Sequence, residues 1–282
     1  MSELNYPLAN LTSWHIGGRA ERFFAPSDLS ALQGYLSTLP LDIPVTYLGL
    51  GSNVLIRDEG IAGSVILTRG LQSLAQRPEG TIYVEAGVAC AKLARFACRL
   101  GLSDAAFFAG IPGTVGGALA MNAGAFGGET WEWVKSVGVL DRQGNLIVRS
   151  PKEYHISYRT VLGPPNEVFV WAEMQFPPNA IDGLERIRSL LRKRAETQPI
   201  GTFNCGSVFR NPQGEFAAKL IEASDLKGYR IGDAMVSEKH ANFIINIGQA
   251  RADDVIQLIE KIQATVSDKW QITLHPEVRI LG

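Results

Sequence analysis

Residues 109–129 read AGIPGTVGGALAMNAGAFGGE and contain seven glycines, at positions 110, 113, 116, 117, 124, 127 and 128. The stretch has no Lys or Arg. Glycine loses more conformational freedom on folding than any other residue. The cluster therefore predicts sharp turns, or a backbone that approaches a ligand very closely. A second glycine-rich turn, LGLGSNVLI, lies at residues 48–56.

Two such turns favour a bound dinucleotide. A backbone without side chains can direct several N–H groups at one anion. Each charge-assisted hydrogen bond contributes roughly 1.5–3 kcal/mol, so a pyrophosphate can be held without a lysine. Neither turn matches GxGxxG before a long helix, which argues against a Rossmann fold. The alternative is that both segments are only tight turns between packed strands.

Composition limits the classes of protein that are possible. The chain has 282 residues, 46% hydrophobic and 20% charged, with a net charge of -1. We expect a cytoplasmic globular protein of about two domains, with no nucleic-acid or membrane partner. No signal peptide pattern is recognisable at the N-terminus. Cys90, Cys98 and Cys205 form no CxxC pair and no metal spacing, so reduced thiols and no metal site are expected.

Hydrophobic periodicity predicts irregularly mixed strands and helices, which indicates the α+β class. Asp182 is expected to cap the helix at 183–196. The loop 227–240 is expected to lack regular structure. The predicted helices lie within 87–102, at 183–196, near 215–224 and at 252–270; the predicted strands lie in 45–67, 81–87, 134–150 (a hairpin), 167–176, 241–248 and 271–281.

Several long motifs resemble one family over nearly the whole chain. They include WHIGGRAERFFAPSDL (14–29), the two glycine-rich segments, YHISYRT (154–160), NCGSVFRNP (204–212), LIEASDLKGYRIGDAMVSEKHANFIINIG (220–248) and LHPEVRILG (274–282). The family is UDP-N-acetylenolpyruvoylglucosamine reductase, a flavoenzyme of peptidoglycan precursor synthesis. The short span between Tyr158 and Glu196 resembles the second, shorter subtype.

The resemblance implies an α+β fold with three parts. An FAD-binding fold of the vanillyl-alcohol-oxidase type is expected in two subdomains, 1–67 and 68–197. A C-terminal α+β substrate-binding domain is expected at 198–282, whose last strand returns to the flavin. The resemblance implies a protein that binds FAD non-covalently and uses NADPH as co-substrate. We expect it to be a monomer.

The resemblance also assigns binding residues by their place in the motifs. Those for FAD are Gly49, Gly51, Ser52, Asn53, Gly110, Ile111, Pro112, Gly113, Thr114, Gly116, Gly117, Ala123 and Gly124. Those for the nucleotide-sugar substrate are Tyr158, Arg210, Asn211, Lys227 and Tyr229.

The family reaction reduces UDP-N-acetylglucosamine enolpyruvate to UDP-N-acetylmuramate. A hydride reaches the methylene carbon, and the resulting enolate must be stabilised and protonated. The motifs match Arg159 and Glu277 to enolate stabilisation and Ser207 to proton donation. Cys205 is a rival donor, since two residues along a strand share one face. For Glu277 the alternative is an ion pair with Arg279 on a strand surface.

Some positions depart from the family pattern or stay open. Thr197 stands where many relatives carry Lys, and Arg194 is a possible substitute one helical turn earlier. The sequence does not assign His15 or His240. Two other functions are considered: a different FAD oxidoreductase on the same fold, such as an oxidase of a small alcohol, and a non-catalytic nucleotide-binding protein.

Overall fold

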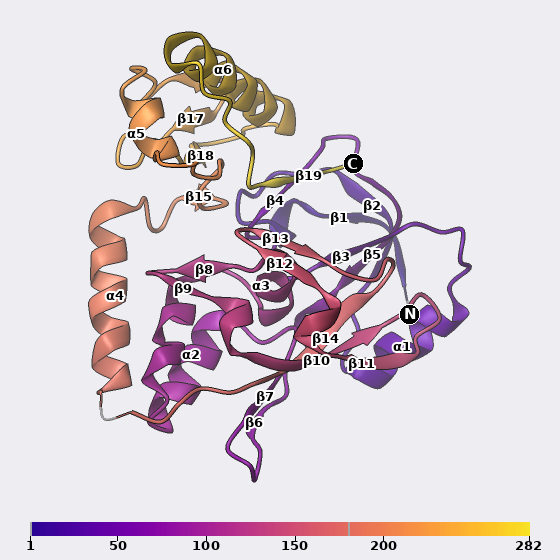
Figure 1. Ribbon diagram of the computed structural model, residues 1–282. Helices are drawn as coiled ribbons and strands as arrows, with labels where there is room; N and C mark the ends of the chain where they lie inside the picture. The colour runs from indigo at the N-terminus through magenta and orange to yellow at the C-terminus, as the bar shows by residue number, and fades with distance from the viewer. Residues whose placement is uncertain (1, 180) are drawn as a thin grey trace. The chain divides into compact units, whose positions relative to one another are not determined.

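The computed structural model describes residues 2–179 and 181–282, which form two compact units. The first contains Phe23–Leu50 and Gly63–Arg194; the second contains Glu3–Arg22, Gly51–Ala62 and Ala195–Gly282. The chain passes from the second unit to the first along strands β2 (Arg19–Phe24) and β5 (Ile61–Leu67). It returns to the second unit between Leu50 and Gly51, and again within helix α4 (Gly183–Thr197), drawn in salmon in Figure 1. The predicted boundaries at 67 and 197 stay a prediction.

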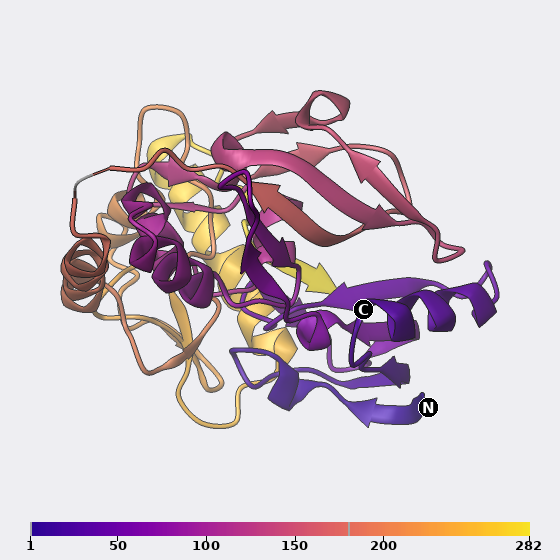
Figure 2. The same ribbon diagram turned by 90° about the horizontal axis from the view of Figure 1, so that it is seen from below.

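A five-stranded antiparallel sheet is the centre of the first unit, with strand order β11-β10-β14-β7-β6. Figure 2 shows its long strands, in magenta to salmon, twisted beside each other. Along β14, Val168, Val170, Ala172 and Met174 are buried in alternation, as a strand with one buried face requires. The strands are β6 (Leu74–Gln76), β7 (Ile82–Glu85), β10 (Val134–Leu140), β11 (Leu146–Arg149) and β14 (Val168–Met174).

The remaining elements of this unit are short. Strand β3 (Val45–Leu48) pairs in parallel with β5, and two small hairpins are formed by β8 with β9 and by β12 with β13. Asp182 Oδ1 accepts the N–H groups of Leu184 (2.9 Å) and Glu185 (3.1 Å), which confirms the predicted helix cap. These elements are α1 (Leu29–Thr38), α2 (Cys90–Arg99), α3 (Val115–Met121), β8 (Gly124–Ala125), β9 (Gly128–Glu129), β12 (His155–Ser157) and β13 (Thr160–Leu162).

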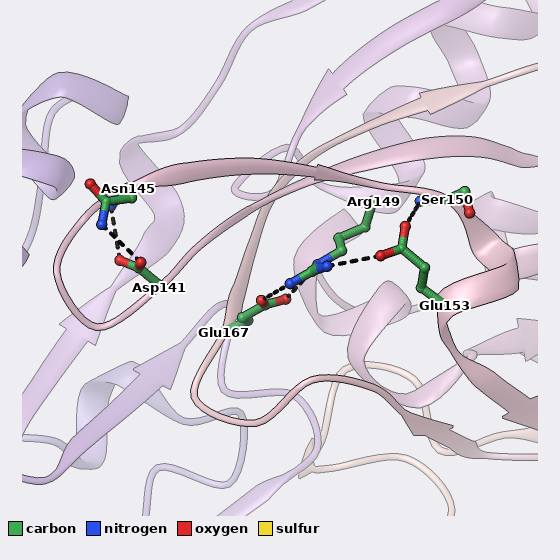
Figure 3. A network of polar contacts seen from close by, with 6 residues as sticks. All are labelled: Asp141, Asn145, Arg149, Ser150, Glu153 and Glu167. Atoms are coloured by element: carbon green, nitrogen blue, oxygen red, sulfur yellow. Dashed lines mark hydrogen bonds and ion pairs between the residues drawn. The ribbon is translucent and has the colours of Figure 1, made fainter.

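Polar contacts fix the β10–β11 hairpin and the segment that follows it (Figure 3). Asp141 Oδ1 accepts the N–H groups of Gln143 (2.8 Å) and Asn145 (2.9 Å), which closes the predicted turn. Arg149 forms ion pairs with Glu153 (2.8 Å) and Glu167 (2.5 Å). One guanidinium therefore ties the hairpin to the start of β14.

The second unit contains a four-stranded antiparallel sheet, β15-β18-β17-β16, with helices α5 and α6. The predicted helix at 252–270 is confirmed, and its apolar face is buried. The elements are β1 (Glu3–Pro7), β4 (Val54–Ile56), β15 (Phe203–Asn204), α5 (Ala217–Glu222), β16 (Arg230–Ile231), β17 (Ala234–Val236), β18 (Ile244–Asn246), α6 (Ala252–Trp270) and β19 (Arg279–Leu281).

Two predictions of secondary structure were wrong in this unit. The expected loop 227–240 contains the hairpin of β16 and β17, because Gly232, at φ 54°, forms a two-residue turn with Asp233. The expected strand 271–281 is a strand only at Arg279–Leu281, paired in parallel with β4. Pro276 has no N–H for a ladder, and it makes only an isolated bridge to Phe209.

Candidate active site

The turn between β3 and β4 (residues 49–53) has the conformation expected of an anion cradle. Gly51 has φ 61°, and a Cβ there would lie 2.1 Å from the carbonyl oxygen of Leu11. Only glycine fits this position. The backbone N–H groups of residues 49–52 donate no hydrogen bond to any residue that the structure describes. They can therefore donate to a ligand.

The second glycine-rich segment leads into α3. Thr114 caps this helix, with its Oγ1 accepting the N–H of Gly117 over 3.4 Å. Gly116 lets the helix approach the backbone directly after β7, since a Cβ there would lie 2.8 Å from Ala86 Cβ. Within the described chain, the Thr114 N–H also donates no hydrogen bond.

The two turns meet within the first unit at Gly49 and Thr114. A Cβ on Gly49 would lie 2.6 Å from Thr114 Oγ1. The unpaired N–H groups of Gly49, Leu50 and Thr114 therefore lie in one unit, where no lysine or arginine side chain is needed to attract an anion. This donor set fits the pyrophosphate of a dinucleotide.

Arg159 stands at the turn of the β12–β13 hairpin with φ 54°, in the left-handed region. Its guanidinium donates to the carbonyl oxygens of Asn122 (3.3 Å) and Gly124 (3.0 Å). It also lies over the Tyr158 ring, 5.0 Å from the centroid. The cation is therefore positioned by the glycine-rich segment, and the exposed Tyr158 lies against it.

Asn122 joins the glycine-rich segment to this hairpin, a role the sequence analysis missed. The side chain is 1% exposed. Its amide donates to Glu129 (2.8 Å) and to the carbonyl of Ser157 (3.3 Å), and its oxygen accepts the N–H of Trp131 (3.1 Å). An Asn that follows a helix and adopts a left-handed conformation is a typical helix C-cap. The position of Asn122 before Ala123 and Gly124 could therefore have indicated this role from the sequence.

In the second unit, the segment that carries Ser207 pairs with the segment that carries Glu277. The Glu277 N–H donates to Val208 O over 2.7 Å, and the Arg210 N–H donates to His275 O over 2.9 Å. Two predicted catalytic residues, 70 positions apart in sequence, thus lie on adjacent backbones. Asn53 reaches the same place, since its side chain donates to Glu277 O over 3.1 Å.

Cys205 does not share a strand face with Ser207, contrary to the expectation. Strand β15 ends at Asn204, and Gly206 has φ 81°, which breaks the alternation of an extended chain. Cys205 is 4% exposed, whereas Ser207 is half-buried. Burial and then the Glu277 carboxylate raise the pKa of the Cys205 thiol, so the thiol is held neutral and inward.

The predicted substrate residues of the second unit lie around α5 and the hairpin after it. Asn211 Oδ1 accepts the Ala217 N–H over 3.1 Å and so supports the start of α5. Lys227 forms a 2.6 Å ion pair with Glu222. Tyr229 is 42% exposed. Arg210 is half-buried directly after the Ser207 segment.

The remaining open positions have these surroundings. His15, at φ 57°, stacks on Phe203 with ring centroids 4.1 Å apart. Burial lowers the pKa of His240 and that of Arg194.

Among the described residues, no group of three His, Cys, Asp or Glu side chains is arranged to hold a metal, and no helix is long and apolar enough to span a membrane.

Comparison with known proteins identifies the family. The model of the UDP-N-acetylenolpyruvoylglucosamine reductase C-terminal domain matches residues 198–281, and the FAD binding domain model matches residues 20–150. The chain is 51% identical over 299 aligned positions to the reductase of that name from Coxiella burnetii (strain Dugway 5J108-111), covering 99% of this chain and 95% of the relative. The chain belongs to the UDP-N-acetylenolpyruvoylglucosamine reductase family. The predicted family and the predicted class of enzyme, an FAD-dependent reductase, are confirmed.

Two further comparisons agree with this family assignment. The reductase of Alkalilimnicola ehrlichii is 52% identical over 279 positions, covering 98% of this chain and 93% of the relative. The crystal structure of UDP-N-acetylenolpyruvylglucosamine reductase from Thermus caldophilus is 32% identical with a TM-score of 0.85, covering 100% of this chain and 98% of that one. The predicted fold class, an FAD-binding fold followed by a C-terminal α+β domain, is confirmed.

Proposed function

We propose that this enzyme reduces UDP-N-acetylglucosamine enolpyruvate to UDP-N-acetylmuramate with NADPH, for peptidoglycan synthesis. The family supports the substrate. The observation that carries the proposal is the pairing of the Ser207 and Glu277 segments beside Asn53, because it unites a proton donor, a carboxyl group and a cofactor turn in one unit. We expect the NADPH and the nucleotide sugar to be its only partners.

FAD would be held non-covalently by the two glycine-rich segments. The free N–H groups of Gly49, Leu50 and Thr114, all in the first unit, would donate to its pyrophosphate. Glycines 49, 51 and 116 keep the backbone close, since a Cβ at each would overlap a neighbour. When bound, FAD would supply the hydride-transfer chemistry that carries a hydride from NADPH to the methylene carbon of the substrate.

Ser207 would then donate the proton. Hydride addition leaves an enolate, a base strong enough to take a proton from a hydroxyl group. A serine adds no negative charge beside the nascent anion. Ser207 is half-buried, so its hydroxyl can contact substrate, whereas the Cys205 thiol is buried and inaccessible to substrate.

Arg159 and Glu277 would stabilise the enolate. A guanidinium stays charged throughout and can grip the substrate carboxylate with two parallel N–H bonds. Arg159 is oriented for this by the carbonyls of Asn122 and Gly124. Glu277 would orient the groups that face the developing charge. The nucleotide-sugar substrate would contact Tyr158, Arg210, Asn211, Lys227 and Tyr229.

The first test is anaerobic NADPH consumption with and without UDP-N-acetylglucosamine enolpyruvate. Consumption equal to the substrate added is expected. Flavin reduction without turnover on that substrate would instead favour another oxidoreductase on this fold.

The second test separates the two half-reactions in S207A and C205A. In S207A we expect flavin reduction by NADPH at the normal rate and reoxidation by substrate slowed about 10²–10⁴-fold. C205A should reoxidise normally. Normal reoxidation in S207A would remove Ser207 from the mechanism, and slow reoxidation in C205A alone would assign the donor to Cys205.

A further inference from the structure

The segment Val208–Arg210, directly after Ser207, is hydrogen-bonded along both edges. One edge faces the residues around Glu277, as described above. The other edge faces Asn242, whose backbone carbonyl accepts the Val208 N–H over 2.9 Å. Strand β18 begins only at Ile244, so no regular strand covers this second edge.

The side chain of Asn242 replaces the missing strand. Its Oδ1 accepts the Phe209 N–H over 2.9 Å, and its Nδ2 donates to Phe209 O over 2.8 Å. The residue is only 4% exposed. Both backbone groups of Phe209 are therefore satisfied by one buried amide.

Few side chains could do this. The two bonds need a donor and an acceptor side by side, which a primary amide provides. An aspartate of the same shape would direct a second oxygen at the Phe209 carbonyl. An alanine would leave two buried backbone groups without partners.

Asn242 is itself firmly held by a compact turn. Ser237, which is 2% exposed, accepts the N–H groups of Lys239 (3.2 Å) and His240 (3.4 Å) on its Oγ. The Ser237 N–H donates to Phe243 O over 2.8 Å, and the Phe243 N–H donates to His240 O over 3.0 Å. These hydrogen bonds fix the backbone that carries the Asn242 side chain.

We propose that Asn242 is a positioning residue for proton transfer. By clamping the Phe209 backbone, it fixes the peptide two residues from Ser207 and so fixes the direction of the Ser207 hydroxyl. The inference rests on the proposed role of Ser207. It assigns no contact between Asn242 and substrate.

The test compares N242D with N246D as a matched control. Asn246 is also a buried amide (7% exposed), but its side chain binds Trp14 O (3.0 Å) and the N–H groups of Gly248 and Ala250. Both half-reactions are measured anaerobically in the holoenzymes, together with S207A and the double variant S207A/N242D. Reoxidation is also measured in deuterated water.

In N242D we expect normal flavin reduction by NADPH and reoxidation slowed about 10²-fold, the usual cost of a misplaced reacting group. The solvent isotope effect on reoxidation should rise. N246D should change neither rate. Because Asn242 acts through Ser207, adding N242D to S207A should slow reoxidation no further.

Four results would overturn the inference: normal reoxidation in N242D, equal slowing of both half-reactions in N242D, the same defect in N246D, or full additivity with S207A. Normal reoxidation in S207A would show separately that the proposed donor is wrong. If N242D does not fold, N242Q replaces it, since its amide is kept one methylene farther out, and the same pattern of rates is required.

Discussion

The side-chain amide of Asn53 donates a hydrogen bond to the backbone carbonyl of Glu277 over 3.1 Å, across 224 positions of sequence. The Asn53 carbonyl accepts the Arg279 N–H over 3.0 Å, and the parallel pairing of β4 with β19 begins at the next residue. The end of the chain is thereby attached to the proposed FAD turn. Cofactor binding and the position of Glu277 should therefore depend on each other.

Replacing Asn53 with Ala should weaken the binding of FAD and disturb the position of Glu277. Losing a hydrogen bond of about 0.5–1.5 kcal/mol corresponds to roughly a 2- to 12-fold weaker affinity for FAD, measured by titrating the cofactor into the apoprotein. Reoxidation by substrate should also slow. Asn10, exposed and distant from this contact in sequence, gives the control N10A. Equal FAD affinity in the two variants would contradict the prediction.

Two glycines of the chain should respond to alanine in opposite directions. G51A places a Cβ 2.1 Å from Leu11 O at φ 61°, so we expect about 1–3 kcal/mol lower stability and loss of bound FAD. G34A lies in helix α1 with nothing within 4 Å of the new Cβ. It should raise the free energy of unfolding by about 0.5–1 kcal/mol. Urea denaturation of both variants measures this, and a stable, flavin-loaded G51A would refute the close approach.

Local features were predictable from the sequence. The bounds of α6 follow from five apolar residues at helical spacing, and the Asp182 cap follows from its place before an amphipathic run. The closing strand was overestimated because Pro276 interrupts it, although that proline was visible. In the hairpin after α5, the Gly232–Asp233 turn was the overlooked signal.

Long-range contacts were not predictable from local patterns. Ser207 and Glu277 could be assigned by motif, but their pairing depends on how distant segments come together. Asn242 reads as one polar residue in a turn, and nothing in EKHANF reveals that its amide completes a backbone ladder. The contacts of Asn122, which lies among glycines in the sequence, were likewise not predictable from its neighbours.

The two carboxylates on Arg149 should differ in their effect on stability. The Glu167 side chain is 9% exposed and receives two guanidinium bonds, whereas that of Glu153 is 40% exposed and solvent-screened. E167Q should therefore lower the denaturation midpoint more than E153Q. Circular dichroism melting of the two isosteric variants tests this, and equal or reversed losses would contradict it.

The pH dependence of stability should contain a contribution from His240. Burial lowers the pKa of this imidazole, the nearby Lys227 lowers it further, and a backbone hydrogen bond and Glu222 partly oppose the shift. The unfolded chain takes up the proton at about pH 6.5, whereas the native state takes it up only at lower pH. As pH falls between these two values, the unfolded state binds more protons and the native state loses stability.

H240Q removes this titration while keeping a polar side chain. The free energy of unfolding of the wild-type protein should fall more steeply than that of H240Q between about pH 7 and about pH 5. The two curves should converge in slope above the unfolded pKa, where neither state carries the proton. Urea titrations at a series of pH values measure both curves. Parallel curves through the acid range would mean that the native imidazole takes up its proton as readily as the unfolded one, and that its burial has no energetic cost.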